Sequence, residues 1–471
     1  MAFIFFTEGE RKVRPGVYQR HTNTGFNTPN NYQDGHCAIP VQATWGPLGK
    51  VVRNNVPTDL TKNYGAGTYG TDYTVPAAAA MFDGGAVVVY TYRLGTGGEK
   101  ASKEITTGLT VTAKYPGTMP VSVAVQDNLG NSNTKKLQVY AGTSLVEEFA
   151  FAADKTAEGA NLIAAAKNSK YVDVTGAAAT VPALAVASGA LEGGSNPTVT
   201  NEDYSKAFAA FETYWYNTIA LDVDDPDMTL GLLLTTYLAN AYKLGKMGVA
   251  VIGSNSTIDF ETRLGYARAI NDCKAVFLGS GWMSGTENKD GVMAICYTAG
   301  VIAATPSNQG IVHTVINGAT EMCESLTNAQ FEDAIEAGML MVSMSNDGSI
   351  WYDSGVNTLI TPDDATQDLG WKKIRRVKCR FEMIRRMDSA LSPKVGRISA
   401  NSDGIADVIQ TGQRVLNAMI NEGKLSPGAL FTEDKSNPAA GDSAWFIIQA
   451  DDIDSLEKIY LQFQFRYSQE S

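Results

Sequence analysis

The chain has 471 residues, of which 19% are charged, and its 38 basic and 50 acidic residues give a formal net charge of −12. This length suffices for a large core in two or three domains, whereas the acidic balance argues against broad binding to the phosphate backbone of nucleic acids. No apolar run reaches the roughly 18 residues of a membrane span. The apolar cluster at residues 3–6 is short and follows no basic residue, so we expect no signal peptide.

The cysteines and histidines give no sign of a metal site or a disulfide framework. Five cysteines are scattered along the chain without a CxxC pair, so buried free thiols in a reducing compartment are expected. His36 and Cys37 form the sole adjacent pair of soft ligands, and nothing nearby completes a metal site. We therefore expect no metal and no other cofactor.

Residues 1–20 are expected to form an N-terminal arm. Pro15 lacks a backbone donor and Gly16 loosens the chain, which together favour an edge strand over a central one. An apolar arm of this kind needs a strand partner. The residues that we assign to contact between subunits here are Val13, Pro15, Gly16, Val17 and Tyr18.

The next two segments differ in character. Residues 21–95 show short strands and turns and include the apolar run at 86–90, which suits a strand covered on both faces. Residues 96–200 contain short β-prone runs, few aromatic residues and turns such as Pro116-Gly117. We predict an inserted, mainly β outer domain there.

From residue 201 the pattern alternates between strands and helices, which implies parallel strands with helices packed on them. Strands are expected at 218–223, 248–252, 275–278, 340–344, 349–352 and 444–448. Helices are expected at 229–243, 259–270, 291–304, 328–337, 368–390 and 404–422. The predicted fold is an α/β core, a mixed sheet with flanking helices, built from both ends of the chain. Its predicted parts are 1–20, 21–95, 96–200, 201–454 and a C-terminal strand or arm at 455–471.

The last stretch of the chain has the period of a β-strand. Odd positions from 459 onward are apolar and the even ones are mostly polar, which predicts one apolar and one wet face over 456–467. Such a terminal strand must pair within its domain or with another chain, so two adhesive ends indicate a subunit that exchanges strands with its neighbours. The arm residues are Ile459, Tyr460, Leu461, Phe463, Phe465 and Tyr467.

Asp222-Val223-Asp224 is the strongest indication of an enzyme. Two carboxylates after an apolar strand can hold Mg²⁺ while one acts as a nucleophile, as in haloacid-dehalogenase-type phosphatases. Asp225-Pro226 replaces the residue that this chemistry needs next. Acidic residues and a proline also start a helix well, and we favour that interpretation. An Mg²⁺-dependent phosphatase-like hydrolase stays as an alternative.

Residues 371–387 combine apolar positions at helical spacing with eight basic residues and one acidic residue. A solvated helix face is the simpler interpretation, and an electrostatic dock for an acidic partner is the functional one. Nucleic acid is less favoured, because no aromatic residues interleave on the polar side.

An ordered set of short motifs gives the chain a family resemblance. The motifs are Pro15-Gly16-Val17-Tyr18, Gly46-Pro47-Leu48-Gly49, Val89-Tyr90 with Arg93-Leu94, Tyr115-Pro116-Gly117-Thr118, Leu191-Glu192-Gly193-Gly194, Ala299-Gly300-Val301-Ile302-Ala303 and Glu457-Lys458-Ile459-Tyr460. In this order they resemble the tail sheath proteins of contractile bacteriophages and R-type bacteriocins, in the form common in Gram-positive hosts. Met119-Pro120 departs from the family pattern, which has a Gly-Asn pair there.

The resemblance implies a structural subunit, not an enzyme. It implies stacked hexameric rings in a helical array around an inner tube, with neighbours linked by their terminal arms and the insertion pointing outward. On a signal from the baseplate, the array shortens and drives the tube through a cell envelope without nucleotide hydrolysis. Expected partners are other copies of the chain, the tube protein, and the baseplate and tail terminator proteins, in a particle assembled in the host cytoplasm.

Within this picture the basic helix becomes a candidate for the face that grips the tube. The tube-facing candidates are Lys372, Lys373, Arg375, Arg376 and Arg380. A self-assembling shell without contraction is the other alternative to a contractile sheath.

Overall fold

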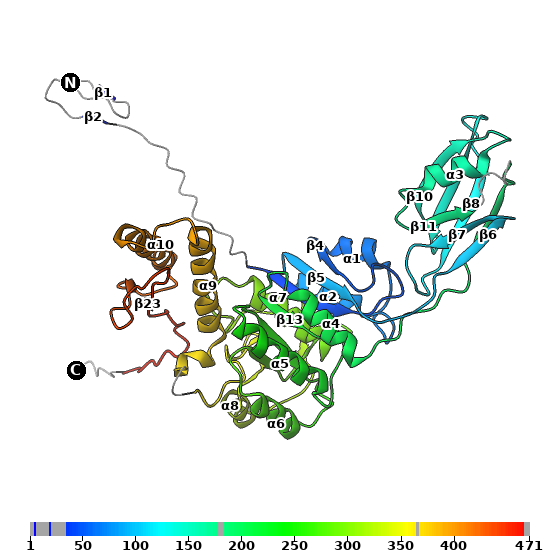
Figure 1. The fold of residues 1–471 in the computed structure, drawn as a ribbon. Coiled ribbons are helices and arrows are strands. Elements are labelled where there is room, and N and C mark those ends of the chain that lie inside the picture. The colour runs from blue at the N-terminus through cyan, green and yellow to red at the C-terminus, as the bar shows by residue number, and fades with distance from the viewer. Residues whose placement is uncertain (1–3, 6–17, 20–33, 177–182, 364–366, 466–471) are drawn as a thin grey trace.

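The computed structural model describes residues 4–5, 18–19, 34–176, 183–363 and 367–465. An α/β body lies at the centre of Figure 1, with a β domain on one side and a helical subdomain on the other. Among the described residues, no helix is both long and apolar enough to cross a membrane.

A seven-stranded sheet forms the body, in the order β19-β15-β14-β13-β3-β5-β4. All neighbouring pairs are parallel except β4 with β5. The parallel register of β13 beside β3 joins the segments before and after the insertion, which confirms a mixed sheet built from two separate parts of the chain. Its strands are β3 His36–Val41, β4 Val51–Asn54, β5 Val88–Arg93, β13 Thr218–Ala220, β14 Val249–Gly253, β15 Ala275–Leu278 and β19 Met339–Leu340.

Helices cover both faces of this sheet, as the fully buried central strands require. One face packs on α2 Val75–Asp83 and α7 Val292–Ala304, with α1 Pro57–Tyr64 at its edge. The other face packs on α4 Asn201–Phe211, α5 Thr229–Lys243, α6 Phe260–Ile270 and α8 Asn328–Glu336.

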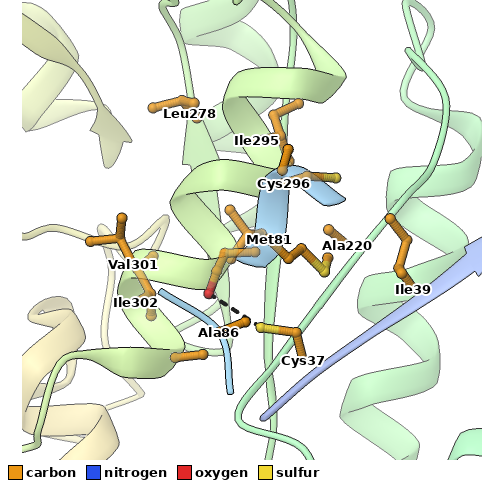
Figure 2. Packing of buried hydrophobic residues seen from close by; sticks show 14 of the residues in the cluster. Cys37, Ile39, Met81, Ala86, Ala220, Leu278, Ile295, Cys296, Val301 and Ile302 are labelled. Atoms are coloured by element: carbon orange, nitrogen blue, oxygen red, sulfur yellow. Dashed lines mark hydrogen bonds between the residues drawn. The ribbon is translucent and has the colours of Figure 1, made fainter. Parts of the chain in front are cut away.

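The contact between α2 and α7 depends on glycine. Figure 2 shows Met81 of α2 against Cys296 and Ile302 of α7, with Cys37 of β3 directly beside them. A Cβ added at Gly300 would overlap the carbonyl oxygen of Met81. The two helix backbones can therefore approach this closely only because residue 300 has no side chain.

The outer β domain has a core of its own. Its two sheets run in the orders β10-β9-β8-β12 and β11-β7-β6, and helix α3 Glu158–Ala166 closes one side. Its strands are β6 Ser102–Thr106, β7 Leu109–Ala113, β8 Val121–Asp127, β9 Thr134–Ala141, β10 Ser144–Ala152, β11 Val172–Gly176 and β12 Ala187–Ala190.

Two side chains of the body fix the root of this domain. Trp45 packs edge-on to Tyr115 and stacks on Tyr171, at ring-centroid distances of 5.3 and 5.7 Å. The fully buried guanidinium of Arg93 donates to the carbonyl oxygens of Ala43, Gly46 and Pro116 at 2.8–2.9 Å.

The helical subdomain follows residue 367. The short 3₁₀ helix η2 Leu369–Lys372 leads into α9 Ile374–Leu391, and η3 Ser392–Lys394 leads on to α10 Ser402–Asn421. The antiparallel hairpin of β22 Leu430–Glu433 and β23 Phe446–Gln449 packs on α9 and α10 around Phe431. Smaller strands complete the described elements: β1 Ile4–Phe5, β2 Tyr18–Gln19, β16 Trp282–Ser284, β17 Glu287–Lys289, β18 Glu321–Met322, β20 Val342–Met344 and β21 Ile350–Tyr352.

Candidate assembly surface

The C-terminal segment is solvent-exposed along residues 458–465, and residues 456–465 pair with no other described strand. The predicted strand is wrong for the isolated chain, because these residues have no strand assignment in the described structure. The alternation in the sequence is nevertheless there, and Ile459, Leu461, Phe463 and Phe465 are all exposed, Phe465 by 94%. Tyr467 lies outside the described residues.

The N-terminal arm is described only in part. Val13, Pro15, Gly16 and Val17 lie outside the described residues, and Tyr18 belongs to β2, which pairs in parallel with Ile4 and Phe5 of β1. The assignment of these residues to contacts between subunits therefore stays a prediction.

The hairpin β22–β23 has no third strand within the described part of the chain. Gln413 of α10 covers part of the outer edge of β22, accepting from the amide of Phe431 and donating to the carbonyl of Ala429, which leaves the outer edge of β23 as the candidate for an added strand. A two-stranded hairpin is marginally stable by itself. This one also leaves apolar side chains in water, namely Leu430, Trp445, Ile447 and Ile448. Open backbone donors and acceptors beside apolar side chains are the features that accept an added strand.

An apolar groove of about 400 Å³ lies beside this hairpin, between the end of α9, the start of α10 and the loop that leads to β23. The apolar residues that line it are Leu391, Val395, Ile398, Ile405, Val408 and Phe446. Val395 is 79% exposed, so the groove opens to solvent.

The basic residues of α9 are not the open positive face that a solvated helix or an electrostatic dock requires. Arg375 and Lys378 are buried, and Lys378 donates to the carbonyl oxygens at the end of α7. Arg376 and Arg380 bind carboxylates, and Lys373 pairs with Glu457. The assignment of the tube-facing candidates stays a prediction for Lys372, Lys373, Arg375, Arg376 and Arg380. Fewer unpaired positive charges are available for such a contact than the sequence indicates.

Sequence reasoning missed the acidic partners of this helix. Asp452 and Glu457 are more than 70 residues away along the chain. The signal was present, because residues 451–457 contain four acidic residues and no basic one. The negative charges of this acidic run just before the C-terminal segment match the positive charges on α9.

The carboxylates at 222–225 are used in the fold. Asp222 is fully buried and accepts hydrogen bonds from Thr74 and Tyr204, the latter at 2.8 Å. Burial raises the pKa of Asp222 to about 6, although both hydrogen bonds favour its charged form.

The two carboxylates that follow serve helix starts. Asp224 accepts from the amide of Val292 at 2.9 Å at the start of α7, and Asp225 accepts from the amide of Gly231 in the first turn of α5. Within the described residues no group of three or more His, Cys, Asp or Glu side chains is placed to hold a metal ion.

Comparison with known proteins gives two family matches. The model of the phage tail sheath protein beta-sandwich domain matches residues 96–196, and that of the phage tail sheath protein central domain matches residues 197–354. Together the matches span more than half of the chain.

Two relatives come from Bacillus subtilis (strain 168). The phage-like element PBSX protein XkdK is 24% identical over 98% of both chains. The uncharacterized protein YqbK is 28% identical over 75% of this chain and 74% of its own.

Solved structures share the fold. The sheath tail protein Lin1278 from Listeria innocua superposes with a TM-score of 0.71 at 18% identity, covering 90% of this chain and 96% of its own. The sheath tail protein DSY3957 from Desulfitobacterium hafniense gives a TM-score of 0.70 at 19% identity, over 93% and 100% of the two chains. The chain belongs to the phage tail sheath protein family and is a structural subunit of a tail sheath.

Proposed function

We propose that the chain is a non-catalytic subunit of a contractile sheath that polymerises as stacked hexameric rings around an inner tube. The fold also resembles the helical sheath of the anti-feeding prophage in its contracted state, with a TM-score of 0.53 at 14% identity over 97% and 99% of the two chains. Baseplate and tail terminator proteins are the expected partners at the two ends of the array.

The exposed tail supports this proposal most directly. The described segment 456–465 carries six large apolar side chains that are at least 70% exposed. Burying a large apolar side chain is worth about 1.5–3 kcal/mol, so an isolated subunit gains much free energy by covering this segment.

The acceptor that we propose is the hairpin β22–β23 of a neighbouring copy. An added strand satisfies open backbone groups at about 0.5–1.5 kcal/mol per hydrogen bond, and the apolar groove beside β23 takes one of its side chains. Because the hydrogen bonds of the added strand do not depend on the chain that leads to it, the α/β bodies of neighbouring subunits can reorient while the strand pairing between them persists.

A catalytic role has no support in the described residues. The carboxylates that an Mg²⁺-dependent phosphatase would use are buried or bound to helix starts.

Paired substitutions on the two faces of the tail test the linkage. Phe463→Asp with Phe465→Asp places charge on the apolar face and should abolish ordered polymers in negative-stain images. The control, Gln462→Asp with Gln464→Asp, adds the same charge to the polar face of the same segment and should polymerise normally. Normal tubes from the first variant would refute strand exchange, and closed shells from the native protein would favour a non-contractile assembly.

A further inference from the structure

The base of the C-terminal arm is bound along α9 by a ladder of polar contacts. Asp452, Ser455 and Glu457 contact Arg376, Arg375 and Lys373 in turn. As the chain moves forward from 452 to 457, its contacts move backward along the helix. The arm therefore leaves the body near the start of α9.

The strongest contact of the ladder is at Asp452. Its carboxylate accepts two hydrogen bonds from Arg376, at 2.6 and 2.9 Å, and a third from Arg380 at 3.0 Å. The side chain of Asp452 is only 6% exposed. Burial alone would raise its pKa, but the hydrogen bonds from the two guanidinium groups outweigh burial and lower the pKa. A carboxylate held in this way is charged at neutral pH.

Arg380 is itself held in place by other groups. Arg380 also binds Asp368 through two hydrogen bonds at 3.0 and 3.1 Å, and its guanidinium lies over the ring of Trp371 at 4.6 Å. Planar guanidinium forks of this kind fix orientation as well as distance. The site that receives Asp452 is therefore preorganised.

The backbone on either side of Asp452 is pinned as well. The amide of Ser426 donates to the carbonyl of Asp451 at 2.8 Å, and the amide of Ile453 donates to the carbonyl of Lys424 at 3.1 Å. Further along, a Cβ added at Gly310 would lie 2.8 Å from the hydroxyl of Ser455, so the base also packs against the loop after α7. All these contacts end at Glu457, where the exposed segment starts.

We propose that residues 451–457 form a latch, in which the guanidinium groups of Arg376 and Arg380 hold Asp452 and fix the point from which the C-terminal arm leaves the body. The basic face of α9 then serves this chain's own tail rather than an external acidic surface. In an assembled array, tension along the arm reaches the body at α9. This inference rests on the proposed role of the arm only for that last step, because the latch itself belongs to the single subunit.

Hydrogen exchange of the full-length protein, measured by mass spectrometry before assembly, tests the latch. Asp452→Asn keeps the shape of the side chain and removes its charge. We expect peptides that cover 450–457 to exchange at least tenfold faster, while β13–β15 exchange at the native rate. The control is Asp407→Asn on α10, which breaks the ion pair with Lys394 of η3 and should leave the exchange rate at 450–457 unchanged.

Arg380→Lys provides a second, milder variant, because lysine keeps the charge but loses the fork. It should accelerate exchange at 450–457 by about threefold. It becomes the decisive variant if β13–β15 lose protection in Asp452→Asn, because that result would mean that Asp452→Asn destabilises the whole body. Native exchange rates at 450–457 in the decisive variant, or an equal rise in Asp407→Asn, would overturn the latch. Deletion of residues 458–471 leaves every latch contact in place, so polymers formed by that truncation would refute the arm's role without touching this result.

Discussion

Arg93 gives the sharpest test of how the outer domain is attached to the body. Its guanidinium is fully buried and donates to three carbonyl oxygens, two in the loop after β3 and one, on Pro116, in the outer domain. Burial lowers the pKa of Arg93 to about 10, so the side chain is a cation at neutral pH. Arg93→Met keeps most of the volume and removes every donor.

The cost follows from the three acceptors that would be left in a dry site. A buried polar group without a partner costs about 1–3 kcal/mol, and Arg93→Met leaves three carbonyl oxygens in that condition while removing the charge itself. Because the loops at Gly46 and Pro116 can relax toward water in part, we expect a loss of about 4 kcal/mol in the free energy of unfolding.

Equilibrium denaturation in urea, followed by tryptophan fluorescence, measures this loss, since Trp45 packs at the same junction. Arg53→Met is the matched control, because Arg53 is exposed on β4 and bonds only the side chain of Asn55 among the recorded contacts. It should change stability by no more than about 0.5 kcal/mol. A loss below about 1 kcal/mol for Arg93→Met would show that the three carbonyls find other donors, and the reasoning would fail.

Two further predictions concern the body. Gly300→Ala should destabilise the chain by about 3 kcal/mol in the same assay, because the new methyl group overlaps the Met81 carbonyl and must separate α2 from α7. The matched control is Gly265→Ala on α6, where the added methyl group meets nothing within 4 Å and should stabilise the chain by up to about 1 kcal/mol. For Asp222, the folded-state pKa of about 6 lies above the ordinary value of 3.8, so the folded state binds the proton more tightly and the group's contribution to stability falls as pH rises from about 4 to 6. The stability of the native protein relative to Asp222→Asn should therefore drop by about 2–3 kcal/mol between pH 4 and pH 7, and a pH-independent difference would contradict the burial of this carboxylate.

Local sequence patterns predicted the elements of the body well. The predicted bounds of α5 and β15 match the structure to the residue, because apolar periodicity and flanking polar residues act within a few positions of one another. The alanine-rich run at 152–166 has the composition of a helix but is helical only from Glu158 on, because Ala152 still pairs with Thr134 at the end of β10 and residues 155–157 form a turn. An alanine-rich run has helix propensity, but tertiary pairing decides between the two.

The candidate site was harder to predict, because its contacts join distant parts of the chain. Read alone, the basic face of α9 suggests an external partner, because the sequence does not show that Asp452 and Asp368 pair with its arginines. The alternation at 456–465 correctly shows which side chains are apolar, but a strand exists only when a second strand supplies its hydrogen bonds. Neither fact can be read from spacing within a single segment.

The contrast between the body and its tail bears on how the subunit works. The body buries charged groups such as Arg93 and Asp222 with their partners in place, so deforming it separates buried polar pairs at a cost of several kcal/mol each. The segment 458–465 has no comparable packing, and its apolar side chains are exposed to solvent. A rearrangement of the array therefore costs least when it moves bodies as units and bends the chain just beyond the latch, after Glu457. The latch then determines where that bend occurs, which gives the acidic run at 451–457 a role that the strand alone does not explain.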